Sequence, residues 1–151
     1  MAQSTLFEPI ERVIRTYIQA CNDADPKAIA ACFQPEAAHY FPPGRTKRLG
    51  AVTIGDNFAN AVREHGFHWS VDQLLSDVHR YAAVMEWTRV NRLRDRLVRG
   101  VDWFVFEPHT ISIQEIRCYY AAPLHSEMQR QELTDFDYAA RGYPLTEIRG
   151  R

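Results

Sequence analysis

The sequence has few cysteines, and their spacing fits neither disulfides nor a metal centre. Only three occur among 151 residues, Cys21, Cys32 and Cys118, an odd number with no CxxC pair. Disulfide-stapled domains need dense, even-numbered cysteines, and structural zinc sites need closely spaced ligands. We therefore expect free thiols, a cytoplasmic location and no metal site.

Long apolar runs and a strong net charge are also lacking. No stretch approaches the roughly 20 apolar residues of a membrane helix, and the start, MAQSTLFEPIERV, does not have the pattern of a signal peptide. The 18 basic and 19 acidic residues give a formal net charge of −1. We therefore expect neither a membrane nor a nucleic-acid partner. No glycine-rich phosphate loop or Ser/His/Asp spacing is visible, and we expect no cofactor.

What is present begins with an amphipathic helix. Its apolar residues recur at i, i+3, i+4, i+7, i+8 and i+11, the spacing of one helical face. They are Ile10, Val13, Ile14, Tyr17, Ile18 and Cys21. The face is broad enough to pack against a core.

Two further helices are predicted. Asp25 followed by Pro26 is a capping residue with proline at the first helical position, so a second helix starts there and closes at QPEA. Its inner face is expected to be Ile29, Cys32 and Phe33. A third helix is predicted from Thr53 to His65, ended by Gly66.

From Phe67 onward the pattern is that of strands. Four β-like runs cover residues 67–80, 81–93, 97–107 and 110–120, separated by charged or proline-bearing turns, and a short strand is expected near 37–41. Three helices followed by an antiparallel meander predict an α+β fold. A curved antiparallel sheet folded around the helices would enclose a cone-shaped pocket, the default position for a site.

This order of elements resembles the NTF2-like (cystatin-like) superfamily, specifically its SnoaL-like and ketosteroid isomerase-like branches. The likeness rests on RTYIQACNDADPKAIAACFQPEA and GVDWFVFEPHTISIQEIRCYY. It implies an NTF2-like domain over residues 1–123. Residues 124–151 are expected to form a C-terminal helix and tail that pack on the same domain or on a dimer partner. The superfamily includes isomerases, dehydratases, cyclases, epoxide hydrolases and non-enzymes, so the likeness bears on fold more than on reaction.

The resemblance transfers unevenly to single residues. Tyr17 and Asp102 match the tyrosine and aspartic acid of the oxyanion hole in ketosteroid isomerases. Phe41 stands where those enzymes have their catalytic base. Cys118 stands where polyketide cyclases and limonene epoxide hydrolases have a central aspartate.

Strand alternation points to the same pocket independently of the resemblance. If Asp102 faces inward, so do its alternate neighbours and the matching face of the next strand. The expected substrate-binding walls are Phe33, Phe41, Trp87, Phe104, Cys118 and Tyr120. In such surroundings Asp102 could stay neutral and donate a hydrogen bond beside Tyr17, or ionise and act as a general base. The alternative is a core tyrosine and an aspartate paired with an arginine.

His39 is the natural substitute proton carrier, since its pKa is ordinarily near neutrality. Alternation puts it on the same face as Phe41. A partly exposed strand histidine is the plain alternative.

Five arginines crowd one predicted hairpin: Arg89, Arg92, Arg94, Arg96 and Arg99. They could bind an anionic substrate tail or nucleic acid, but a solvated hairpin that discourages edge pairing is the preferred interpretation. The outer sheet face, with Val101, Trp103, Val105 and Tyr119, is too apolar for water. We expect it to form a homodimer.

The first functional hypothesis is a cofactor-independent enzyme. It would carry out proton-transfer chemistry (isomerisation, dehydration or cyclisation) on a small hydrophobic, cyclic or aromatic molecule. Asp102, Tyr17 and His39 would be its catalytic residues. The second is a non-catalytic protein that binds a small hydrophobic ligand in the same cavity, and the third is a protein-interaction module that uses the apolar sheet face.

Overall fold

A computed structural model describes residues 8–41, 45–93, 96–120, 135, 137 and 140, without the side chains of residues 8, 96 and 120. Its described helices are α1 (Glu8–Asn22), α2 (Pro26–Ala30) and α3 (Ala51–His65). Almost all of the predicted C-terminal helix and tail over 124–151 lies outside the described residues.

The helices begin and end where capping chemistry allows it. The Asp25 carboxylate accepts hydrogen bonds from the backbone N–H groups of Lys27 and Ala28 at 3.1 and 3.0 Å, which confirms the predicted start of α2. Gly66 ends α3 in the left-handed region at φ 64°, and its N–H donates to the Val62 carbonyl oxygen at 2.8 Å. The predicted stop is confirmed, because glycine takes this conformation without steric cost.

The second helix is shorter than predicted. It stops at Ala30, and β1 (Phe33–Tyr40) takes up both Phe33 and the QPEA segment. The Ile113 N–H donates to the Cys32 carbonyl oxygen at 2.8 Å, so tertiary pairing fixes this backbone in extended form. The pairing register shifts between Phe33 and Ala38, a stretch that contains Pro35, which has no N–H to contribute.

The sheet is mixed rather than antiparallel, which corrects the prediction. The strands after β1 are β2 (Arg48–Leu49), β3 (Phe67–Asp77), β4 (Ala82–Asn91), β5 (Arg96–Phe106) and β6 (Ile113–Tyr120), in the order β2-β1-β6-β5-β4-β3. The last four form the expected antiparallel meander, but β1 pairs with β6 in parallel. The helix α3 and the strands β2 to β5 separate β1 from β6 in the chain, so no tight turn forces them antiparallel.

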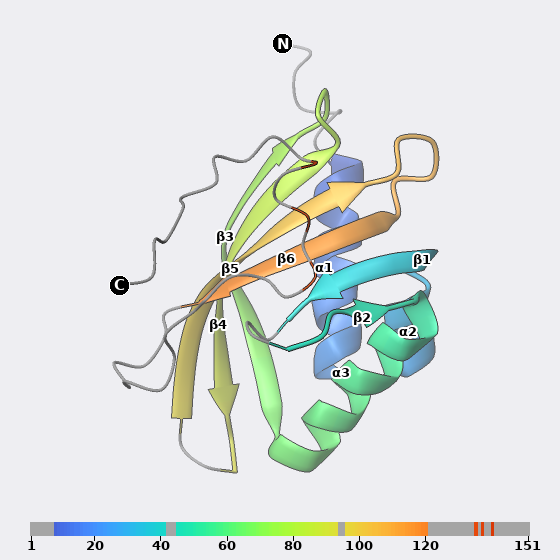
Figure 1. The fold of residues 1–151 in the computed structure, drawn as a ribbon. Helices are drawn as coiled ribbons and strands as arrows, with labels where there is room; N and C mark the ends of the chain where they lie inside the picture. The colour runs from blue at the N-terminus through green and yellow to red at the C-terminus, as the bar shows by residue number, and fades with distance from the viewer. Residues whose placement is uncertain are drawn as a thin grey trace, which may run out of the picture.

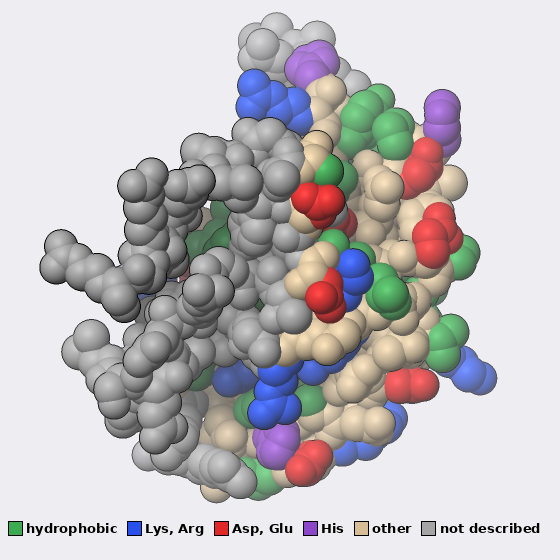
Figure 2. All heavy atoms as spheres, viewed as in Figure 1, with side chains coloured by type: hydrophobic (Ala, Val, Ile, Leu, Met, Phe, Trp, Pro, Cys, Tyr) green, Lys and Arg blue, Asp and Glu red, His purple; other side chains and the backbone are tan. Residues whose placement is uncertain are grey.

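The sheet curves around the helices. Figure 1 shows the helices on one side of it, with α3 beside the β1–β2 edge. The apolar face of α1 meets the concave side, where the core includes the fully buried Ile14, Met85 and Phe104. In Figure 2, acidic and basic side chains are interspersed over the described part of one face.

The outer face keeps two large rings in contact with water. Trp103 is 41% exposed and Tyr119 44%. Beside them, Arg117 Nε lies 3.0 Å from Glu115 Oε1, and the Arg117 guanidinium lies 5.5 Å from the centre of the Trp103 ring. The homodimer through this face stays a prediction. In the part of the chain that the structure describes, no helix is long and apolar enough to cross a membrane.

Candidate functional site

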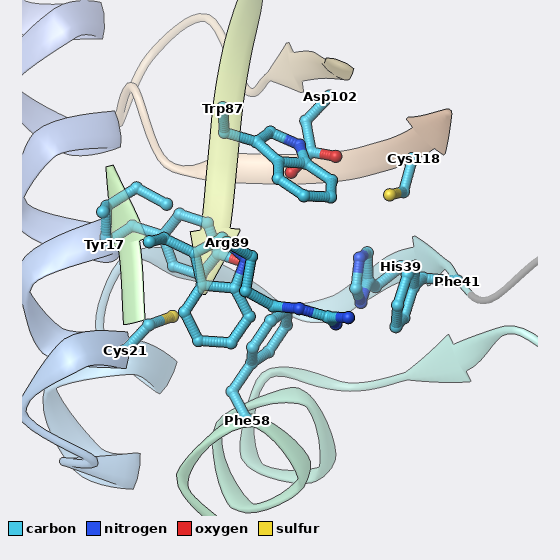
Figure 3. Close-up of a pocket in the computed structure, with 11 residues that line it drawn as sticks. Tyr17, Cys21, His39, Phe41, Phe58, Trp87, Arg89, Asp102 and Cys118 are labelled. Atoms are coloured by element: carbon cyan, nitrogen blue, oxygen red, sulfur yellow. The ribbon is translucent and has the colours of Figure 1, made fainter. Parts of the chain in front are cut away.

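A narrow cavity lies between the concave sheet face and helices α1 and α3. Its open space between atoms, including the mouth, amounts to about 370 Å³. The lining residues are Tyr17, Ile18, Cys21, His39, Phe41, Phe58, Trp69, Trp87, Arg89, Asp102 and Cys118. Figure 3 shows the three predicted catalytic residues converging on it from α1, β1 and β5. Residues far apart in the sequence therefore share one small, largely apolar space.

Asp102 is the buried acid of this cavity. It is 7% exposed and makes no ion pair with any residue in the described ranges. Burial raises the pKa of its carboxyl from 3.8 to about 6, against smaller lowering effects from Cys118 and Trp87. Cys118 lies directly opposite on β6. Trp87 Nε1 and Asp102 Oδ1 have no hydrogen-bond partner of normal geometry among the described residues, although the indole is near enough to affect the carboxyl.

Gly100 makes room for the indole that covers this acid. It pairs with Trp87 across β4 and β5, and a Cβ at position 100 would overlap the Trp87 ring and lie 2.7 Å from the Tyr119 carbonyl oxygen. The absence of a side chain at Gly100 thus lets Trp87 lie flat against the sheet, next to Asp102.

Replacing Gly100 by alanine is expected to destabilise the protein by about 1–3 kcal/mol, the usual cost of overpacking. Thermal unfolding measures the loss, and a change in tryptophan fluorescence reports that Trp87 has moved. Val101→Ala, on the opposite face of the same strand, serves as the control and should change the fluorescence little. An unchanged melting temperature for Gly100→Ala would mean that the indole is not held against position 100.

Tyr17 brings a hydroxyl from α1. The side chain is 1% exposed and sits edge-on to the rings of Phe33 at 5.3 Å and Phe104 at 6.2 Å. Burial, with smaller effects from Cys21 and Asp102, raises the pKa of this phenol well above its ordinary 10. Tyr17 therefore keeps its proton at physiological pH and can act as a hydrogen-bond donor.

His39 departs from the sequence expectation. Its ring stacks with those of Phe41 and Phe58, with distances between ring centres of 5.6 and 5.1 Å. The side chain is only 2% exposed. Burial, assisted by the nearby positive charge of Arg48, lowers the pKa of the imidazole to about 3. A near-neutral proton carrier was predicted, whereas the structure holds a neutral imidazole inside an aromatic wall.

The predicted walls divide into two groups. Phe41, Trp87 and Cys118 line the cavity. Phe33 and Phe104 are not among the lining residues: they pack against the Tyr17 ring as part of the core, and a role for them in substrate binding stays a prediction. Alternation gave them the right face of the sheet, but α1 fills the space in front of them. The side chain of Tyr120 lies outside the described residues.

Several lining residues are not among the site residues predicted from the sequence. For some of them the sequence periodicity does indicate an inward position. Arg89 stands two positions after Trp87, so strand alternation puts it on the inner face, whereas the preferred interpretation of the sequence places it in a solvated hairpin. Its guanidinium lies 4.0 Å from the centre of the Phe67 ring. Cys21 comes one helical turn after Tyr17. Phe58 and Trp69 had no comparable signal, because their position depends on how α3 and β3 close over the sheet.

The described residues hold no group of three or more His, Cys, Asp or Glu side chains arranged to bind a metal ion. The three cysteines are free and buried. The ionisable groups that line the cavity are an acid, a phenol, an imidazole, an arginine and two thiols.

Comparison with known proteins identifies the family. The model of the SnoaL-like domain matches residues 14–112, while no curated protein matches the chain. A crystal structure of a protein of unknown function with a cystatin-like fold, from Methylobium petroleophilum PM1, is 40% identical, with 95% of this chain and 96% of that chain covered and a TM-score of 0.86.

Two more distant structures share the fold. One is SalBIII, an epoxide hydrolase/cyclase-like enzyme in pyran ring formation in the polyether salinomycin. It is 17% identical, with 76% of this chain and 92% of that chain covered and a TM-score of 0.64. The other is an NTF2-like protein of unknown function from Cytophaga hutchinsonii. It is 12% identical, with 74% of this chain and 89% of that chain covered and a TM-score of 0.58. With its helix-packed, curved mixed sheet, the chain belongs to the SnoaL-like family of the NTF2-like superfamily.

Proposed function

We propose that this protein is a cofactor-independent enzyme that moves a proton on a small hydrophobic, cyclic or aromatic molecule. The reaction class is isomerisation, dehydration or cyclisation. One observation carries the proposal: a buried carboxyl with no ion pair to a described residue shares a cavity with a protonated phenol. Burying a carboxyl without a cationic partner is costly, and such groups concentrate at functional sites.

The raised pKa suits Asp102 to the role of base. With a pKa of about 6 the carboxyl is ionised at pH 7, and it is a stronger base than an ordinary aspartate. In the proposed step Asp102 takes a proton from a carbon next to a substrate carbonyl, and the electron pair moves onto the carbonyl oxygen. Tyr17 donates a hydrogen bond to that oxygen as its negative charge develops. Asp102 then returns the proton to another carbon or to a departing hydroxyl, so it ends as it began.

The rest of the cavity supports this role by excluding water. Phe58, Trp69 and Trp87 present rings to the space in which a substrate would lie. A low-dielectric surrounding strengthens the hydrogen bond from Tyr17 to a developing oxyanion. The neutral imidazole of His39 is part of this wall in the proposal, with no charge to carry.

The relatives are compatible with such chemistry. SalBIII, which shares the fold at low identity, is described as cyclase-like and acts in pyran ring formation. Ring closure belongs to the reaction class proposed here. This likeness bears on what the fold can host, whereas the argument for this chain rests on Asp102 and Tyr17.

A non-catalytic binding protein is the second candidate. It is favoured by Phe41 and Cys118, which stand where related enzymes are expected to carry acids and which line the cavity here with a ring and a thiol. In that case Asp102 and Tyr17 would only hold a polar group of the ligand.

Hydrogen exchange separates the two candidates even while the product is unidentified. We expect the protein to speed the replacement of hydrogen by deuterium next to the carbonyl of a single-ring ketone, such as cyclohex-2-enone or 3-hydroxycyclohexanone, in D₂O. Proton NMR follows the signal. The matched control is Glu86→Gln, which removes a carboxylate on the outer face and should leave the exchange intact. A ketone that binds but neither exchanges nor converts would favour the binding protein.

A further inference from the structure

Arg48 is a cation that lies against two rings of the cavity wall, Phe41 and Phe58, and has no counter-ion among the described residues. It lies on β2, directly across from His39 on β1. Its guanidinium is 5.5 Å from the centre of the Phe41 ring and 5.9 Å from that of Phe58. Arg48 makes no ion pair with any described residue, and burial lowers its pKa.

Two other arginines of the chain, in contrast, have carboxylate partners. Arg99 lies 2.8 Å from Glu86, and Arg117 lies 3.0 Å from Glu115. A guanidinium that is half withdrawn from water usually has a carboxylate partner, because desolvation of an unpaired charge is unfavourable. The stacking on two phenyl rings offsets part of this cost. Because this stacking uses the flat face of the guanidinium, the N–H groups at its edge can still bind an acceptor.

His39 adds an unused polar atom beside this cation. Its Nδ1 is buried and has no hydrogen-bond partner in the described part of the chain. Buried polar atoms are nearly always satisfied, so such an orphan in a cavity wall indicates a missing partner. A neutral imidazole can donate one N–H to an acceptor. Arg48 and His39 would therefore bind the same acceptor group.

Arg89 brings another guanidinium, and this one lines the cavity. Arg89 is paired with Trp69 across β3 and β4, and in Figure 3 its side chain extends toward His39. Neither Arg48 nor Arg89 is among the groups that shift the pKa of Asp102. Cys118, which lies opposite Asp102, is affected by both arginines and by the acid. Asp102 is thus the acid of the cavity, and Arg48 is a cation behind its Phe41 and Phe58 rings, with Cys118 near enough to be affected by both.

We propose that the ligand of this cavity carries a carboxylate, bound by Arg48 and His39, on a single apolar or aromatic ring that lies against Phe58 and Trp87. This inference builds on the proposed function, since it takes the same cavity as the substrate site. A carboxylate fits because it neutralises the Arg48 guanidinium and offers two acceptor oxygens, one for Arg48 and one for His39. The substrate class is therefore a small cyclic or aromatic carboxylic acid.

The arrangement also orients the substrate. With its carboxylate at Arg48, a one-ring molecule would direct the opposite part of the ring toward Asp102. The proton removed would then come from a carbon remote from the carboxylate.

Binding of matched probe pairs tests the proposal. Benzoate and benzamide, or cyclohexanecarboxylate and its amide, have nearly the same shape and differ in charge. Ligand-observed NMR titration of the full chain should show each carboxylate binding at least ~10-fold more tightly than its amide, a difference of about 1.4 kcal/mol. Arg48→Met keeps an unbranched apolar side chain over Phe41 and Phe58. It should bring the ratio close to one while leaving the amide affinity unchanged.

Two controls make the result specific. Arg99→Met removes an outer-face arginine and should keep the full preference, and Arg48→Lys should restore part of it because the charge returns without the planar group. Circular dichroism confirms that each variant is folded. The proposal is overturned if the amides bind as well as the carboxylates, if no carboxylate binds, or if Arg48→Met leaves the preference intact. Carboxylate binding by a protein that exchanges no hydrogen in the ring ketones would instead count against the catalytic proposal alone.

Discussion

Replacing Asp102 by asparagine is expected to lower the rate of proton transfer by about 10²–10⁴-fold, the usual contribution of a general base. Asparagine keeps the size of the side chain but cannot accept a proton. In the unmodified protein, kcat/KM should rise with pH and level off above the pKa of about 6 that burial gives this carboxyl. The exchange of hydrogen for deuterium in a single-ring ketone, followed across pH 5–8, measures both effects. A variant as active as the unmodified protein would remove Asp102 from the mechanism.

The same substitution should make the protein more stable at neutral pH. The pKa of Asp102 is about 6 in the folded protein, against an ordinary 3.8, so the folded state binds its proton more tightly than the unfolded state. Well below pH 3.8 both states are protonated and Asp102 costs nothing. The free energy of unfolding falls as the pH rises from 4 to 6. Above pH 6 the full penalty remains, about 3 kcal/mol at most. Asparagine, which does not ionise, avoids this penalty.

Urea unfolding of the two proteins at several pH values checks the sign. The difference in free energy of unfolding should favour Asp102→Asn above pH 6 and shrink toward pH 4. Other titrating groups cancel in the comparison, because both proteins contain them. A variant less stable than the unmodified protein at pH 7.5 would mean that the carboxylate has a favourable partner in the folded state.

Much of this site could be predicted because strand alternation and family likeness point to the same residues. Period-two alternation placed Asp102 and Trp87 on the inner face, and the helical stripe placed Tyr17 on the buried side of α1. The same rule places Arg89, two residues after Trp87 on β4, on the inner face. Local periodicity therefore determines which way these side chains face.

The remaining features depend on contacts between distant segments. Arg48 comes beside His39 only because the two-residue strand β2 pairs with β1, and nothing in the local sequence marks so short a strand. The low pKa of His39 depends on its burial between Phe41 and Phe58, which come from different elements. Phe33 became part of β1 rather than α2 for a similar reason, namely its pairing with Ile113.

Replacing Tyr17 by phenylalanine is expected to lower kcat by about 10²–10³-fold, the cost of removing one donor from an oxyanion-stabilising site. The fold should tolerate the change, because the ring contacts with Phe33 at 5.3 Å and Phe58 at 5.7 Å involve no hydroxyl. Tyr40→Phe is a matched control. Tyr40 is also a buried tyrosine, but it is not among the residues that line the cavity.

The pattern of the kinetic losses distinguishes a catalytic hydroxyl from one that only helps binding. A donor that acts on the developing oxyanion lowers kcat and kcat/KM equally, whereas one that only holds the substrate raises KM. The pH dependence should stay that of Asp102, since Tyr17 keeps its proton throughout. Tyr17 and Asp102 act on one step, so the double variant should lose less than the product of the two single losses. Independent losses that multiply in the double variant would mean that the two groups serve separate steps. An unchanged kcat in Tyr17→Phe would mean that Tyr17 is a core residue whose hydroxyl merely borders the cavity.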